Sequence, residues 1–282
     1  MKVRAAVGET LAAIRHAVHG TNSLIGDAVA VYFRSADVAL AFTEAFPLAL
    51  ANDTMVRTDY SPEVPFGRQE KEDVCNLYSM TTAQEAMRRL FPGLSDHAGN
   101  LPPLPEIYPD RTAPIIRTGA AGRELVMARW GLPTPPAYLV GKRSDRGVTN
   151  VRNTASAHWR RWLRPEFRCL VPFTRFAEPD HQRGGNVWFA LPEEVPGFFA
   201  GIQVPQWRSV RKIKDGETVD DLFGFLTCPP NAEVAAIHPK AMPVILTKPA
   251  EWEIWLTAPA TEATALQRPL DDGRLIIDSA AR

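Results

Sequence analysis

The sequence predicts an α+β fold with a mostly antiparallel, partly closed β-sheet core and peripheral helices. From residue 124 onward, short strand-like apolar runs follow one another and are broken by Gly and Pro at short intervals. Helical patterns are few and do not alternate regularly with these runs, which argues against a doubly wound parallel sheet. Apolar residues make up 45% of the 282-residue chain, enough to fill the core of one large domain or of one domain with an appendage.

The first 73 residues form a separate region in this interpretation. Apolar residues over 1–20 recur near the helical period, residues 28–33 resemble a strand, and a helix capped by Ser35 is expected through residue 45. The polar stretch 52–73 carries Pro62, Pro65 and Gly67, as a linker does. We therefore expect a small helix–strand–helix extension over 1–73, followed by a main domain over 74–282.

The main domain begins with Cys75 on a short extended segment ahead of a helix that Thr81 or Thr82 caps. A proline-rich run at 101–114 follows, without a predicted strand. Strand-like runs lie at residues 124–130, 168–173, 186–191, 198–204, 222–228, 243–246 and 274–278. Helical patterns lie at residues 155–163, 231–237, 249–256 and 262–266.

The net charge is zero, but basic residues gather in the middle of the chain. Residues 111–183 hold 14 Arg and Lys against 5 Asp and Glu, and residues 184–282 hold 9 against 13. Such a segment either binds the phosphates of a nucleic acid or is a solvated surface without a partner, and charge alone does not separate the two.

Other classes of protein are excluded by composition. No apolar run is long enough to span a bilayer, and the first residues lack the order of a signal peptide. Three cysteines without a CxxC spacing fit free thiols in a reducing cytoplasm, and no zinc site is expected. Cys169 and Cys228 sit inside apolar strand-like runs, so we expect them to be buried.

Four stretches combine the residue types that thiol chemistry requires. They are residues 73–79 (Asp-Val-Cys-Asn-Leu-Tyr-Ser), 149–153 (Thr-Asn-Val-Arg-Asn), 176–178 (Phe-Ala-Glu) and 237–243 (Ile-His-Pro-Lys-Ala-Met-Pro). In order and rough spacing they resemble the SRAP family, the SOS-response-associated peptidases, which shield abasic sites in single-stranded DNA. The resemblance runs from Cys75 to about Leu270 and leaves residues 1–73 outside.

The resemblance implies a role for each matched residue. The family's cysteine, here Cys75, attacks the ring-opened aldehyde of an abasic sugar with its thiol and its free α-amine, and the product is a thiazolidine. Asn150 would position the cysteine and the sugar, and Arg152 would contact phosphate with its bidentate fork. Glu178 would shuttle protons, and His238 would assist ring opening and crosslink reversal. From the residues alone, Asn150 and Glu178 could equally lie in ordinary turns, and a lone histidine is more often structural.

The sequence also departs from the family pattern. Members often begin Cys-Gly-Arg, whereas here Asn76 and Leu77 follow the cysteine, and the family's aromatic pair is not evident after Pro133. Basic and aromatic residues on the helix over 155–163 could instead form a platform for single-stranded DNA; these are Trp159, Arg160 and Arg161. The alternative is that the tryptophans pack inward, which we expect for Trp162.

We therefore expect a cytoplasmic monomer, associated with the nucleoid when bound to DNA, that crosslinks to abasic single-stranded DNA without a cofactor or metal. Cys75 has no free α-amine while Val74 acylates it, so it must be released. Self-cleavage at that bond is one route, and translation from a GTG codon at Val74 is another, which would make 1–73 upstream sequence. The competing hypotheses are an N-terminal-cysteine amide hydrolase and a non-catalytic reader of modified or single-stranded DNA.

Overall fold

The computed structural model describes residues 76–82, 84–180, 183–192 and 196–278, together with two short strands near the N-terminus. The chain divides into two compact units, Met1–Lys71 and Glu72–Arg282. Cys75 lies outside the described residues, which in the second unit begin at Asn76.

In the first unit, β1 (His16–Ala17) pairs antiparallel with β2 (Ala30–Val31). β2 falls inside the strand predicted over 28–33. β1 falls inside the stretch predicted as a helix, so that prediction is wrong at these two residues, where pairing with β2 overrides the local period. The remainder of residues 1–20, the predicted helix from Ser35 and the linker over 52–73 lie outside the described residues.

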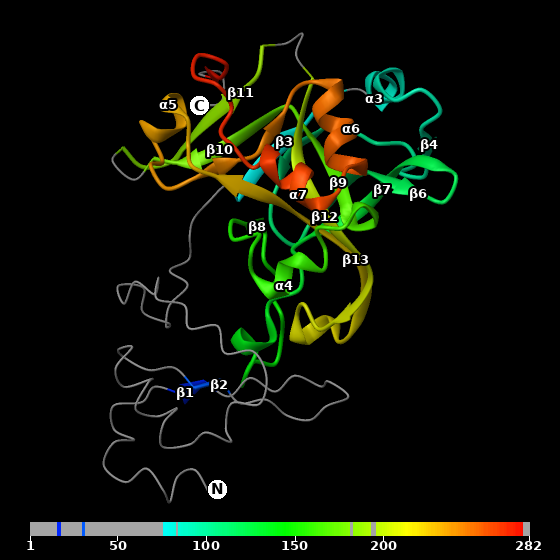
Figure 1. The fold of residues 1–282 in the computed structure, drawn as a ribbon, viewed down its shortest axis with the longest axis vertical. Coiled ribbons are helices and arrows are strands. Elements are labelled where there is room, and N and C mark those ends of the chain that lie inside the picture. The colour runs from blue at the N-terminus through cyan, green and yellow to red at the C-terminus, as the bar shows by residue number, and fades with distance from the viewer. Residues whose placement is uncertain are drawn as a thin grey trace, which may run out of the picture. The chain divides into compact units, whose positions relative to one another are not determined.

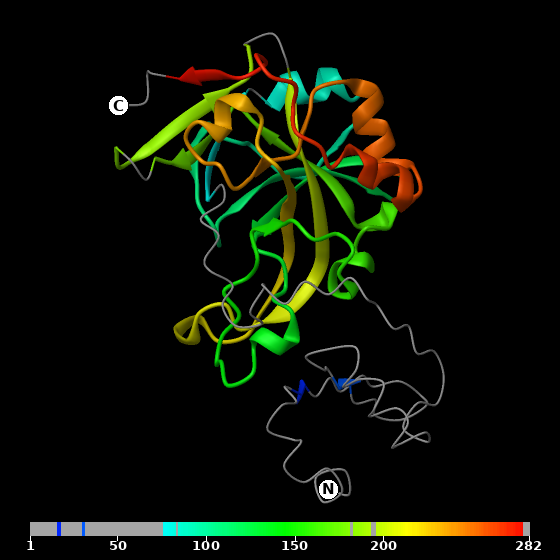
Figure 2. The same cartoon turned by 60° about the vertical axis from the view of Figure 1, so that its left-hand side comes forward.

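Five strands of the second unit close into a ring (Figures 1 and 2). They are β6 (Thr112–Gly119), β7 (Gly122–Trp130), β9 (Arg168–Phe173), β12 (Gly197–Ser209) and β13 (Thr218–Cys228). Antiparallel pairs run in the order β7, β6, β9, β12, β13, and β13 returns to β7 in parallel, with Phe223 opposite Trp130. The predicted α+β fold with a mostly antiparallel, partly closed sheet is confirmed.

Short strands extend the ring at its borders. They are β4 (Ser95–Asp96), β8 (Asn150–Val151), β14 (Met242–Pro243) and β15 (Ile245–Leu246). β8 runs parallel to β13, and β14 pairs antiparallel with it. Two stretches of the predicted site, around Asn150 and around Met242, are therefore attached to the same strand of the ring.

A second sheet has the strand order β16, β11, β10, β3, β5. Its strands are β3 (Leu77–Met80), β5 (Leu104–Ile107), β10 (Arg175–Pro179), β11 (Asn186–Ala190) and β16 (Ile276–Asp278). β10 lies at its centre, antiparallel to both β3 and β11. The structure thus joins the segment after Cys75 directly to the strand that carries Glu178.

Aromatic packing ties this sheet to the ring. The buried ring of Tyr78 on β3 stands edge-on to Trp130, Phe199 and Phe225, with centroids 5.1, 5.7 and 6.1 Å away. Edge-to-face pairs at such distances are favourable beyond the area they bury, because the positive ring edge meets a negative ring face. Since Tyr78 is three residues after Cys75, this packing fixes the direction of the first strand of the domain.

The helices lie around the two sheets. They are α3 (Gln84–Leu90), α4 (Ala157–Arg160), α5 (Ala232–Ala235), α6 (Pro249–Thr257) and α7 (Ala260–Ala263), with single 3-10 turns at Pro136–Tyr138, Pro165–Phe167, Ile213–Asp215 and Thr264–Leu266. On α6, Trp255 donates its indole N–H to the carbonyls of Cys169 and Gly201, which seats the helix on β9 and β12. α6 matches its prediction closely, whereas α4 and α5 are each shorter than predicted. None of the described helices is long and apolar enough to cross a membrane.

Candidate active site

In the second unit the described residues begin at Asn76, and the side chain of this residue is held by the segment that carries Asn150. Thr149 Oγ1 donates a hydrogen bond to Asn76 Oδ1 at 3.2 Å, and Asn150 Nδ2 donates to Thr149 Oγ1 at 3.0 Å. Three polar side chains thus form a connected chain of hydrogen bonds between the start of β3 and β8. Neither Asn76 nor Thr149 was singled out from the sequence as a site residue, although both adjoin a matched one.

The backbone of Thr149 is fixed by the ring. Its carbonyl accepts hydrogen bonds from the Trp130 indole N–H at 3.2 Å and from the Phe225 amide at 3.3 Å. The neighbouring Gly224 permits this approach, because a Cβ there would lie 2.9 Å from the Thr149 carbonyl oxygen. Asn150 therefore leaves the ring at a defined position, half-buried, next to Asn76.

Glu178 lies on β10 and faces the interior. Side chains alternate along a strand, so Glu178 shares a face with Phe176, which is fully buried in the main core. Ala177 faces the other way, into a small cluster with Leu77 and Trp188. The Glu178 side chain has no exposed surface, so its carboxylate requires polar partners inside the protein.

His238 is one of these partners. It follows α5, its amide donates to the Val234 carbonyl at 2.7 Å, and its ring is 1% exposed. Its Nδ1 lies 3.4 Å from Glu178 Oε2 and 3.1 Å from the Ala241 carbonyl oxygen. Both neighbours accept hydrogen bonds, so Nδ1 carries a hydrogen, which leaves Nε2 as the nitrogen that can gain or lose a proton. A buried carboxylate in contact with an imidazole is an arrangement that can exchange a proton with a substrate.

The β10–β3 pairing brings the two halves of the site together. Ala177 lies opposite Leu77, so Glu178 and Asn76 are each one residue beyond that pair, on the side of the sheet that carries Phe176 and Tyr78. The structure therefore places Asn150, Glu178 and His238 around the start of β3. Asn150, Glu178 and His238 are separated from one another in sequence by tens of positions.

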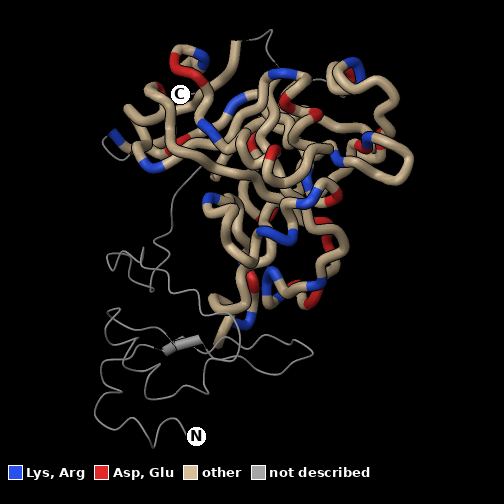
Figure 3. Tube along the Cα trace, in the orientation of Figure 1, with Lys and Arg blue, Asp and Glu red and all other residues tan. Residues whose placement is uncertain are grey.

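The predicted DNA-contacting arginines lie on the surface. Arg152, Arg160 and Arg161 are all exposed, and Figure 3 shows basic positions around α4. The Arg152 carbonyl accepts a hydrogen bond from Gln267 at 2.7 Å, which fixes its backbone while leaving the guanidinium in solvent. The Arg161 guanidinium lies over the Trp162 ring, 3.9 Å from its centroid.

Trp159 does not offer the surface platform that the sequence suggested. Its side chain is 7% exposed, and its ring packs against His158 and Trp162, with centroids 4.4 and 5.8 Å away. Trp162 is 4% exposed and faces inward as expected. Both tryptophans can pack inward because Trp159 lies on the four-residue helix α4 and Trp162 in the turn that follows it. An aromatic platform on this helix is therefore not available to DNA.

The two structural cysteines are buried as expected. Burial raises the pKa of the Cys169 thiol far above its usual range and raises that of Cys228 to about 12. Both thiols therefore stay protonated at neutral pH, and neither is a nucleophile there.

Residues 74–278 match the family model described as SOS response associated peptidase (SRAP). The chain belongs to the SRAP family. This membership associates it with the SOS response to DNA damage and with DNA, and the resemblance drawn from the four motif stretches is confirmed.

Solved structures agree with this assignment. A protein from Bordetella bronchiseptica is 28% identical, with a TM-score of 0.53 over 72% of this chain and 97% of its own. A protein from Bacteroides thetaiotaomicron is 21% identical, with a TM-score of 0.55 over 72% of this chain and 90% of its own, and shows the shared SRAP fold. No functionally curated protein matches the sequence.

Proposed function

We propose that this SRAP protein shields abasic sites in single-stranded DNA by forming a covalent adduct through Cys75. The observation that carries the proposal is the buried contact between Glu178 Oε2 and His238 Nδ1, 3.4 Å apart, beside the first described residue of the domain. A protein that only reads DNA has no need of a buried acid–imidazole pair there. Such a pair costs desolvation energy, which favours a chemical role for it.

The proposal uses the described residue that follows the reacting cysteine in sequence. The side chain of this residue, Asn76, accepts a hydrogen bond from Thr149. That contact is one residue beyond the pairing of Leu77 with Ala177, which leads to Glu178. The nucleophile, Asn150 and the acid–base pair therefore belong to one site in this proposal.

The chemistry requires three groups and releases one water. The α-amine of Cys75 adds to the aldehyde carbon of the opened sugar, and the resulting carbinolamine loses water to give an imine. The thiol then adds to the same carbon and closes a five-membered thiazolidine. An amine with an ordinary pKa of about 8 and a thiol of about 8.5 need only modest help at neutral pH.

The other residues take roles that fit their surroundings. His238, with Nε2 as its basic atom, accepts and returns the protons that move during ring opening and imine formation, and Glu178 stabilises the protonated ring. Asn150 orients the opened sugar with its amide, and Arg152 holds a flanking phosphate with its exposed guanidinium. Arg160 and Arg161 add to the positive surface that attracts the strand.

The proposal includes the release of Cys75 from Val74. A peptide bond removes the α-amine, and an acylated cysteine forms only a reversible thiohemiacetal with an aldehyde. Either hydrolysis of the Val74–Cys75 bond by the protein itself or translation from Val74 followed by removal of methionine yields the free amine. The first route accords with the peptidase in the family description.

Denaturing gel electrophoresis tests the proposal. A chain that begins at Cys75 is expected to give a shifted, denaturation-resistant band with an abasic oligonucleotide and none with the undamaged sequence. Cys75→Ala is expected to abolish the band, whereas Cys169→Ala serves as the matched control and retains it. Retention of DNA in native gels without any denaturation-resistant band would instead identify a non-covalent reader. Glutamine hydrolysis without a band would identify an N-terminal-cysteine amide hydrolase.

A further inference from the structure

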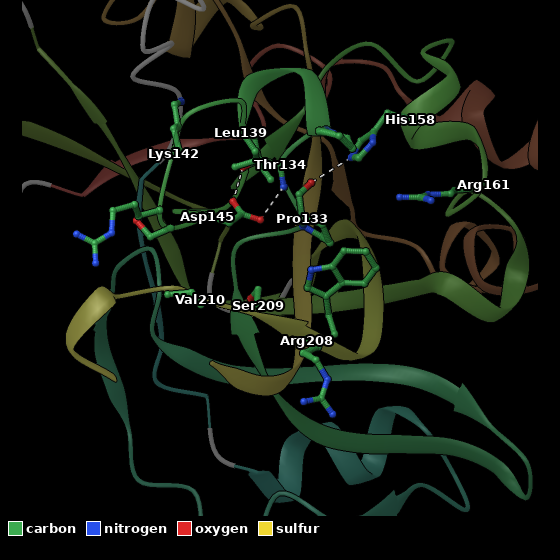
Figure 4. A pocket seen from close by; sticks show the side chains of 14 residues that line it. Pro133, Thr134, Leu139, Lys142, Asp145, His158, Arg161, Arg208, Ser209 and Val210 are labelled. Carbon is green, nitrogen blue, oxygen red and sulfur yellow. Dashed lines mark hydrogen bonds between the residues drawn. The ribbon is translucent and has the colours of Figure 1, made fainter. Parts of the chain in front are cut away.

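A cavity of about 280 Å³ lies beside the hairpin between β12 and β13 and is not part of the site around Glu178. One wall comes from the loop over 133–145, and the other comes from α4 and from residues 207–210 at the end of β12 (Figure 4). Its volume is near the lower limit of the cavities that bind small ligands.

The cavity is held in shape by buried hydrogen bonds. The Asp145 carboxylate accepts from the amides of Thr134 at 3.1 Å and Gly147 at 2.8 Å, and the Asp145 amide donates to the Val210 carbonyl at 2.8 Å. The buried guanidinium of Arg211 donates to the carbonyls of Gly131 and Asp145. These hydrogen bonds fasten the loop and the hairpin to each other.

The rim of the cavity carries a surplus of positive charge. Lys142, Arg143 and Arg161 line it and are exposed, with Lys142 and Arg161 on opposite sides in Figure 4. In the described part of the chain none of these three forms a salt bridge, whereas Arg208 pairs with Glu217 at 2.8 Å. The one lining carboxylate, Asp145, is occupied by its amide donors and lies 3.9 Å from Arg211. An anion would therefore meet three cations that form no salt bridge in the described part of the chain.

The inner part of the cavity is lined mostly by uncharged side chains. Trp207 is partly exposed and is supported edge-on by Trp162, with ring centroids 6.1 Å apart. Pro133 and Leu139 add apolar surface. Burial lowers the pKa of His158, whose Nε2 lies 3.1 Å from the Pro133 carbonyl oxygen, so this ring is neutral at pH 7. Such a surface suits the face of a nucleobase.

We propose that this cavity binds one nucleotide of the DNA strand, with its base against Trp207 and its phosphate among Lys142, Arg143 and Arg161. The inference rests on the proposed function for the identity of the strand. Asp145 and Asn150 are five residues apart, so their Cα atoms are at most roughly 17 Å apart. Even at the 3.4 Å rise per nucleotide of a fully stacked strand, about five nucleotides cover that distance, and a more extended strand needs fewer. The same strand can therefore occupy both sites.

Binding of undamaged DNA tests this proposal separately from the covalent chemistry, because undamaged DNA has no aldehyde. The probe is a fluorescent oligothymidylate of about 16 nucleotides, and its anisotropy is titrated with the full chain at fixed salt. Trp207→Leu is expected to weaken binding by about 5- to 150-fold, the range for loss of one stacked base. Arg143→Ala is expected to lower the salt slope of binding by about one.

Matched variants separate the pocket from general effects. Trp207→Phe keeps an aromatic face and is expected to restore most of the affinity, which shows that loss in Trp207→Leu is not a folding defect. Lys214→Ala removes a positive charge from the same hairpin outside the cavity and is expected to leave the salt slope nearly unchanged.

Three results would overturn the proposal. Unchanged affinity in both Trp207→Leu and Arg143→Ala would exclude a nucleotide in this cavity. Loss of oligonucleotide affinity in Arg143→Ala but not in Trp207→Leu would mean that the cavity contacts a phosphate and binds no base. Unchanged oligonucleotide affinity together with lost binding of thymidine monophosphate in the variants would assign the cavity to a free nucleotide. Failure of abasic DNA to crosslink would defeat the proposed function and leave this test intact.

Discussion

Two groups of candidate site residues differ in their environment. The pair Glu178–His238 is buried, whereas Arg152 and Arg161 are exposed to solvent. The His238 side chain is 2% exposed and the Glu178 side chain 0% exposed, and the two residues lie 60 positions apart in sequence. The arginines are solvated, and in the described part of the chain their contacts include a hydrogen bond to the Arg152 carbonyl and the Trp162 ring under Arg161. In the proposed function the first group acts through its position and protonation, whereas the second acts through its charge.

This difference means that the two groups should affect different quantities. Substitutions in the buried pair change the rate of the chemical step, and substitutions of surface arginines change the affinity and its dependence on salt. The two sets share no described contact, so their effects should combine additively. If substitution of a surface arginine lowered the rate of the chemical step as strongly as His238→Ala, this distinction between the two groups would be wrong.

The largest effect is expected inside the site. His238→Ala and Glu178→Ala should slow formation or reversal of the abasic adduct by about a hundredfold or more, because general acid–base catalysis is lost. Rates are measured by quenched time courses on denaturing gels at saturating DNA. Glu178→Gln keeps the shape of the side chain and removes its charge, so it should be impaired as well. A fast Glu178→Gln variant would reduce this residue to a packing role.

An intermediate effect is expected at the contact between Asn76 and Thr149. Removing this hydrogen bond by Asn76→Ala should lower the free energy of unfolding by about 1 kcal/mol and slow crosslinking less than His238→Ala does. Urea unfolding and the same time courses measure the two effects. Combining it with Thr149→Val in a double-mutant cycle gives the coupling between the two residues, which should be near zero if the contact does not form.

A smaller effect is expected on the surface. Arg152→Ala should reduce the slope of log affinity against log salt by about one, because one phosphate contact is lost. Fluorescence anisotropy with undamaged oligonucleotide at several salt concentrations provides the slope. Arg88→Ala is the matched control, since this exposed arginine on α3 already pairs with Asp96 at 2.7 Å. Equal slopes for Arg152→Ala and the unaltered protein would remove Arg152 from the DNA-contacting surface.

The smallest effect is expected at the buried thiols. Burial raises the pKa of both Cys169 and Cys228, so their thiolates are nearly absent until the pH approaches about 12 for Cys228. Alkylation of the folded protein at pH 8 should therefore modify Cys75 and leave these two unmodified, as peptide mass measurement would reveal. Rapid alkylation of Cys228 at pH 8 would contradict the burial described for it.

The sequence revealed the parts of the fold that have a strong local signal. The apolar run at Arg168–Phe173 became β9 with unchanged bounds, because a continuous buried run with turn residues around it has few alternatives. β6 was missed because Pro114 lies in it. Pro114 precedes the stretch of β6 that pairs with β9, where a missing backbone N–H is tolerated. β10 was missed because Arg175 and Glu178 make it look like a polar turn.

The sequence motifs indicated candidate site residues but did not indicate the contacts between them. Family resemblance indicated Asn150, Glu178 and His238, yet no local pattern connects Asn76 with Thr149, which lie 73 residues apart. Trp159 was expected on the surface but is buried. The direction of a side chain on a four-residue helix depends on tertiary packing, which the local sequence does not determine. The cavity beside Trp207 likewise depends on a long-range contact between a loop and a hairpin.

The most direct test of the central claim is the intact mass of the natively expressed protein, alone and after reaction with an abasic oligonucleotide. The expected result is a chain that begins at Cys75 and an adduct whose mass is that of protein plus DNA minus one water, as thiazolidine formation requires. A stable adduct formed by a chain that still begins at Met1 would contradict the thiazolidine mechanism and both routes that release Cys75.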